Sequence, residues 1–158
     1  MLLSRRAFAG GSAIALLIPK AWAQQSPSPV TGKPRLAIGG YDTVAYFTDG
    51  KPVPGKPVFT FQWHDENWQF ASAAHRDLFI AHPEQYAPQY DGYCAMGVAH
   101  EAGTKLTGDP TAWTIVSGKL YVNNSTHWRD EWRKDTAANI SRADVNWPAV
   151  KNMPEPKS

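Results

Sequence analysis

The sequence predicts an α+β fold in which small antiparallel hairpins pack with several short helices in a single compact domain. Strand-like and helix-like stretches fall into separate short runs rather than alternating regularly along the chain. No internal repeat divides the sequence, and about 135 residues follow an N-terminal export signal, which is enough for one core. Seven Trp, six Tyr and six Phe predict that this core is largely aromatic.

The clearest element is a hairpin with one aromatic face. Every second residue over 59–63 is aromatic, and the alternation resumes at Trp68 and Phe70 after the polar loop 64–67. We expect this aromatic face to be part of the core rather than a cage for a ligand. Before the hairpin, residues 41–47 are expected to form a short helix or turn.

Helices and a second hairpin are predicted after this point. Ser72 can cap a helix over 73–81, because its hydroxyl can accept a hydrogen bond from a first-turn N–H. A short hairpin is expected over 113–122, around a Ser-Gly turn. Two further helices are predicted, one from Asn124 or Ser125 to about residue 136 and one over 139–150.

The N-terminus has the layout of an export signal. Ser4-Arg5-Arg6-Ala7-Phe8 precedes the apolar stretch 13–18, and Ala21-Trp22-Ala23 offers a small-residue cleavage site. The paired arginines resemble those of a twin-arginine (Tat) signal. The apolar stretch is shorter than the roughly 20 residues that span a bilayer.

These features divide the chain into four segments. Residues 1–23 are expected to be a Tat-type signal peptide and 24–35 a disordered linker, with a folded domain over 36–150 and a flexible tail over 151–158. The mature protein is then periplasmic, without a stable membrane anchor. Without the signal the chain carries 13 Lys+Arg and 14 Asp+Glu, so no basic excess points to nucleic acid.

Common catalytic patterns are absent from the sequence. It contains no Gly-rich phosphate loop, no Gly-x-Ser-x-Gly elbow and no His-Glu-x-x-His pair. The sequence does not decide whether the chain is an enzyme, but a binding module fits it better.

Four stretches resemble the exported YHS-domain proteins, some of which are reported with selenocysteine. The stretches are GYDTVAYFTDGKPV, WQFASAAHRDLFIAHPEQYAPQYDGYCA, AWTIVSGKLYVN and RADVNWP, within 38–148. The resemblance implies the scaffold of the YHS and TRASH-like metal-binding modules, which carry three cysteines. Ala45, Ala71 and His75 stand at those cysteine positions, so the thiolate-rich site of these modules cannot form here.

The remaining soft donors centre on Cys94, the single cysteine of the chain. Met96 lies two residues later, and His100 would share a helical face with Met96. His75 adds an imidazole at a position where the resembling modules hold a metal. We therefore predict a metal site drawn from Cys94, Met96, His75 and His100, with copper as the leading ion and zinc or iron as alternatives.

Three interpretations of Cys94 stay open. In the leading one, the protein is a periplasmic module that binds a transition metal and performs no turnover. In the second, Cys94 reacts directly, in a thiol redox protein or an accessory subunit of a periplasmic enzyme, which requires a lowered thiol pKa. In the third, Cys94 is a small buried core residue and the domain binds a periplasmic protein partner.

Overall fold

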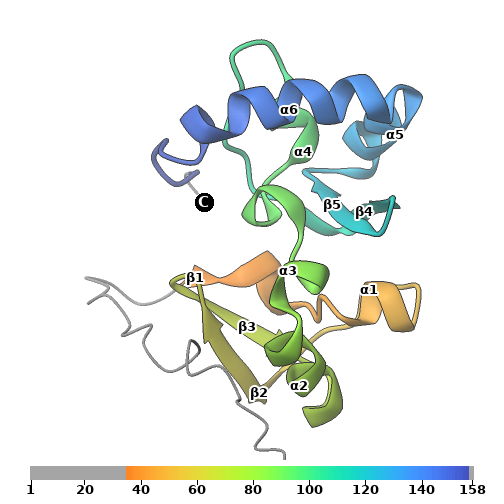
Figure 1. Ribbon diagram of the computed structural model, residues 1–158, viewed down its shortest axis with the longest axis vertical. Coiled ribbons are helices and arrows are strands. Elements are labelled where there is room, and N and C mark those ends of the chain that lie inside the picture. The colour runs from red at the N-terminus through yellow and green to blue at the C-terminus, as the bar shows by residue number, and fades with distance from the viewer. Residues whose placement is uncertain (1–34, 157–158) are drawn as a thin grey trace, which may run out of the picture.

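The computed structural model describes residues 35–156 and has two halves with a sheet in each (Figure 1). A three-stranded sheet lies with α1 and α2, and a two-stranded sheet lies with α4, α5 and α6. Short helices and small sheets together confirm the predicted α+β class. The elements, in chain order, are β1 (Arg35–Leu36), η2 (Ala37–Gly40), α1 (Ala45–Thr48), β2 (Lys56–Trp63), β3 (Glu66–Phe70), α2 (Ala73–Ala81), α3 (Pro83–Tyr86), η3 (Gln89–Gly92), α4 (Ala95–Ala99), β4 (Asp109–Val116), β5 (Lys119–Asn123), α5 (Thr126–Lys134) and α6 (Thr136–Val150).

The first sheet has the strand order β1-β3-β2. The predicted hairpin is present as β2 and β3, with Phe61 opposite Trp68. His64 and Asp65 make its turn at positive φ angles of 49° and 62°, which suits a two-residue hairpin turn. β1 adds two residues in parallel to the free edge of β3, an addition that the sequence did not predict.

The aromatic face of this hairpin packs into the core, as predicted, with its β3 residues buried and its β2 residues Phe59, Phe61 and Trp63 partly buried. Trp68 is 3% exposed and Phe70 is fully buried. Phe79 of α2 packs on both rings, with centroid separations of 5.0 Å and 5.1 Å. Ser72 caps α2 by accepting a hydrogen bond from the His75 N–H at 3.2 Å, which aims the helix across the sheet.

The second half is built on the β4–β5 hairpin and α6. Ser125 caps α5, and Asp135 ends α5 while capping α6 by accepting a hydrogen bond from Ala138 N–H at 3.1 Å. Trp132 of α5 is fully buried, whereas Trp128, one turn earlier, is 39% exposed. The predicted last two helices are therefore both present, and the structure assigns only one of the two Trp side chains to the core.

A shared core joins the two halves. Ile38 and Tyr46 from the first half pack in one cluster with Leu120 and Val122 of β5. The Tyr46 hydroxyl donates a hydrogen bond to the carbonyl of Pro110 at 2.8 Å. These contacts tie the start of the domain to the second sheet.

The expected signal peptide, linker and tail lie at the two ends of the chain. The expected signal peptide and most of the expected linker lie outside the described residues, and Arg35 already pairs in β1. Of the expected tail, Met153 packs against the core cluster of the second half. Within residues 35–156, no helix is both long and apolar enough to cross a membrane.

Candidate functional site

Cys94 lies in the second half of the fold, where it caps α4. Its backbone N–H donates to the carbonyl of Leu106 at 2.8 Å, and it forms a parallel bridge with Val122 of β5. The side chain is 1% exposed. Its Sγ accepts a hydrogen bond from Gly97 N–H at 3.3 Å and lies 3.9 Å from Oδ1 of Asn123.

Burial dominates the electrostatics of this thiol. Loss of water around Sγ raises the pKa of Cys94 above its ordinary value. Backbone N–H groups of Gly97, Asn124 and Met96 oppose that increase because they favour the thiolate, but they do not cancel it. The free protein therefore holds a protonated thiol at neutral pH, beside dipoles that are oriented to stabilise a negative sulfur.

Three of the four predicted ligands line one pocket of about 220 Å³. Its lining consists of Cys94, Met96, Gly97, His100, Thr104, Leu106 and Trp128. α4 explains this convergence, because Cys94 is its N-cap, Met96 lies in its first turn and His100 is its C-cap. Leu106 and Trp128 give the pocket an apolar wall and are themselves 38% and 39% exposed.

His75 lies apart from this pocket. It belongs to α2, which Figure 1 shows in the opposite half from α4. Its Nδ1 lies 2.7 Å from Oδ2 of Asp42, and its Nε2 lies 3.5 Å from the hydroxyl of Thr48. The predicted set is thus divided, with His100 rather than His75 beside Cys94.

Asp42 is the site residue that the sequence reasoning missed. It is fully buried, and its carboxylate accepts hydrogen bonds from the N–H groups of Val44, Ala45 and Ala71 at 2.9, 3.3 and 2.8 Å. His75 is the fourth partner of this carboxylate. Three of the four partners, Ala45, Ala71 and His75, stand at the positions that the YHS resemblance assigns to cysteines. The bonds from Val44 and Ala45 N–H are those of an Asx turn before α1, and Asp is one of the residues that favour such a turn.

The metal-binding capacity of the described chain depends on sulfur. Within residues 35–156 no group of three or more His, Cys, Asp or Glu side chains is placed to hold a metal ion. The Cys94 pocket contains one cysteine and one histidine, so a third protein ligand there would be the thioether of Met96.

Comparison with family models, with curated proteins and with solved structures finds no significant match to this chain.

Proposed function

We propose that this protein is a YHS-like binding module that holds one Cu(I) ion at the Cys94 pocket and performs no turnover. The observation that carries the proposal is the lining of one pocket by a thiol, a thioether and an imidazole, from Cys94, Met96 and His100. This donor set suits Cu(I), because soft sulfur ligands favour it over hard cations. Residues 1–23 are proposed to send the module to the periplasm through the Tat route.

The surroundings of Cys94 fit a thiolate that forms when metal binds. A thiol must lose its proton to become a ligand, so binding releases a proton and strengthens as pH rises. Gly97 N–H already donates to Sγ, and the backbone N–H groups of Asn124 and Met96 also favour a thiolate there. Leu106 and Trp128 add an apolar wall beside the sulfur donors.

The second interpretation, a directly reacting thiol, has less support. A nucleophilic or redox-active cysteine needs a lowered pKa and access to its substrate. Burial instead raises the pKa of Cys94 and leaves the residue 1% exposed. Ligation needs only a small ion to reach the sulfur, so it tolerates this degree of burial better.

A competition titration tests the proposal. The mature chain, starting at residue 24, is titrated anaerobically with Cu(I) against the chromophoric chelator bicinchoninate. We expect one Cu(I) per chain, loss of binding in Cys94→Ser, and weaker binding in Met96→Leu and His100→Gln. Unchanged affinity in Cys94→Ser would rule out the site.

Two further histidine variants locate the imidazole ligand. His75→Gln should keep the Cu(I) affinity, because His75 lies with Asp42 rather than in the pocket. His82→Gln, at the exposed end of the same helix, is the matched control. Loss of affinity in a folded His75→Gln protein would return His75 to the ligand set, and tighter binding of Zn(II) than of Cu(I) would reassign the metal.

A further inference from the structure

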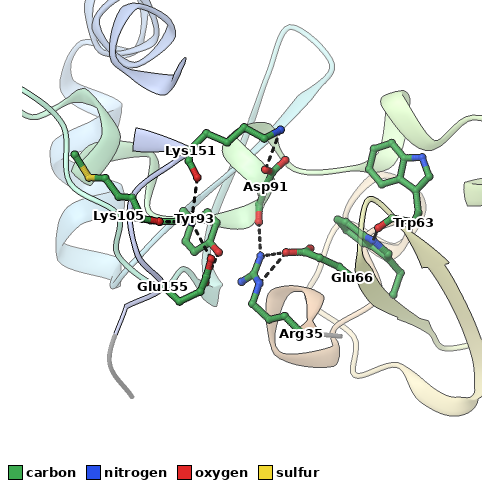
Figure 2. Close-up of polar contacts among 10 residues, drawn as sticks. Arg35, Trp63, Glu66, Asp91, Tyr93, Lys105, Lys151 and Glu155 are labelled. Atoms are coloured by element: carbon green, nitrogen blue, oxygen red, sulfur yellow. Dashed lines mark hydrogen bonds and ion pairs between the residues drawn. The ribbon is translucent and has the colours of Figure 1, made fainter. Parts of the chain in front are cut away.

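The carboxylate of Glu155 is held by two buried donors from the second half of the fold (Figure 2). Lys105 Nζ lies 2.8 Å from Oε1, and the hydroxyl of Tyr93 donates to Oε2. The Lys105 side chain is 7% exposed and Tyr93 is 4% exposed, whereas the side chain of Glu155 is 60% exposed. Lys105 and Tyr93 are therefore buried donors, and Glu155, from the C-terminal segment, is their more exposed acceptor.

The charges around this contact favour an anion. The guanidinium of Arg35 lies 4.5 Å from the centroid of the Tyr93 ring, and Lys105 Nζ lies 4.7 Å from the same centroid. Partial burial raises the pKa of Glu155, but hydrogen bonds from Lys105 and Tyr93 and the nearby positive charges outweigh it and lower that pKa. Arg35 already pairs with Glu66, so Lys105 is the cation that pairs with the Glu155 carboxylate.

Lys105 is fixed independently of Glu155. Its ammonium also donates to the carbonyls of Lys151 and Met153, at 3.2 Å and 3.1 Å. The Tyr93 ring is buried, with its centroid 6.3 Å from that of Trp147, and its backbone forms an antiparallel bridge with Thr107. Removal of the Glu155 side chain would therefore leave both donors in place.

A pocket of about 400 Å³ adjoins the contact. Its lining includes Arg35, Leu36, Ile38, Thr107, Glu155 and Pro156. Glu155 contributes to this lining, so an acid whose carboxylate took its place could extend an apolar body toward Leu36 and Ile38.

We propose that Lys105 and Tyr93 form a binding site for a small carboxylic acid with an apolar body, and that Glu155 fills this site as an internal substitute. The two donors bind different oxygens of one carboxylate, which matches a planar two-oxygen group. The apolar side chains of Leu36 and Ile38 in the adjoining pocket favour an acid with an apolar body over phosphate.

The tail position of Glu155 makes it a competitor for such an acid. A group attached to the same chain acts at an effective concentration of the order of millimolar, so an external acid must displace it. The intact chain therefore binds the acid more weakly than a chain without the Glu155 carboxylate. Its apparent affinity is the intrinsic affinity multiplied by the fraction of molecules in which Glu155 has left the site.

Calorimetric titration of the mature chain with benzoate tests this site. Glu155→Ala should bind benzoate at least about tenfold more tightly than the unaltered chain. Adding Lys105→Met to Glu155→Ala should abolish the binding, and adding Tyr93→Phe should weaken it. The matched control is Glu131→Ala, which removes a surface carboxylate paired with Lys134 and should give no gain.

A second variant and two further probes complete the test. Glu155→Gly also lacks the carboxylate and should behave like Glu155→Ala. Acetate should bind more weakly than benzoate if the apolar pocket takes the body of the acid, and equal affinities would overturn that part. The proposal fails if neither altered chain binds benzoate, if binding survives Lys105→Met, or if inorganic phosphate binds as tightly as benzoate.

Discussion

Sγ of Cys94 lies 3.9 Å from Oδ1 of Asn123, and both residues are almost completely buried. The same Oδ1 accepts a hydrogen bond from the backbone N–H of Met96 at 2.9 Å. One side chain of β5 therefore fixes both the thiol and the first turn of α4. Asn123 therefore links β5 to the residue that begins α4 and to the turn that follows it.

The Cys94 thiol should be alkylated slowly at neutral pH. Burial raises its pKa, so little thiolate is present, and the reagent also has poor access. The rate of reaction with iodoacetamide is followed by mass spectrometry at a series of pH values. We expect it to rise only at pH values above the ordinary pKa range of a thiol. The urea-unfolded chain is the control and should titrate normally, whereas a fast reaction of the folded chain at neutral pH would favour the redox interpretation.

The same group should make stability fall at alkaline pH. Because the folded-state pKa of Cys94 is raised, the folded chain binds this proton more tightly than the unfolded chain does. The contribution of the Cys94 proton to the free energy of unfolding is complete below the thiol pKa of the unfolded chain. It is lost as pH rises through the thiol pKa of the folded chain. Urea unfolding at a series of pH values should show less of this loss in Cys94→Ser than in the unaltered chain, and equal slopes would contradict it.

Asn123→Ala should destabilise the protein by about 1–3 kcal/mol, because Met96 N–H then loses its buried acceptor. The measurement is the free energy of unfolding in urea. Asn124→Ala is the matched control, since the neighbouring Asn124 is exposed and its loss should change stability little. Equal losses of stability at the two positions would show that the hydrogen bond from Met96 to Asn123 does not stabilise the fold.

Asp42→Ala should be among the most damaging single changes in the chain. It leaves three backbone N–H groups and the His75 imidazole without their buried carboxylate partner, at a cost of about 3–5 kcal/mol. Thermal and urea unfolding measure the loss. Asp49→Ala, an exposed carboxyl at the end of α1, is the control and should stay within about 0.5 kcal/mol of the unaltered chain.

The two Trp residues of α5 should differ sharply in their effect on stability. Trp132 is fully buried and packs on Tyr121 with a centroid distance of 5.3 Å, so Trp132→Ala should cost about 3–5 kcal/mol. Trp128→Ala removes a partly exposed side chain and should cost much less. Similar losses in urea unfolding would contradict the burial difference.

Much of the fold was predictable because its signals are local. The alternating aromatic residues from 59 to 70 specify β2 and β3, and Ser72 and Ser125 mark helix starts with their own hydroxyl groups. β1 was not predictable, because two residues carry no pattern and Arg35 pairs with Glu66, 31 positions later. Its formation depends on an edge that exists only after β3 has folded.

In the candidate site, too, the features with a local sequence signal were predictable and those set by long-range packing were not. The spacing of Met96 and His100 indicated a common helical face, and both line the Cys94 pocket. The position of His75 relative to Cys94 depends on how the two halves pack, which no local pattern encodes. The contact between Lys105 and Glu155 joins residues 50 positions apart and left no trace in the sequence for the same reason.

Asp42 also has a consequence for the chain as a polymer. Its carboxylate is bonded to Ala71 and His75, which lie 29 and 33 positions later, so it closes a long loop across the first half of the domain. Disulfides and structural zinc ions close loops of this length in other small domains. Here the Asp42 carboxylate closes the loop through hydrogen bonds, so a single side chain joins the segment before α1 to the start of α2.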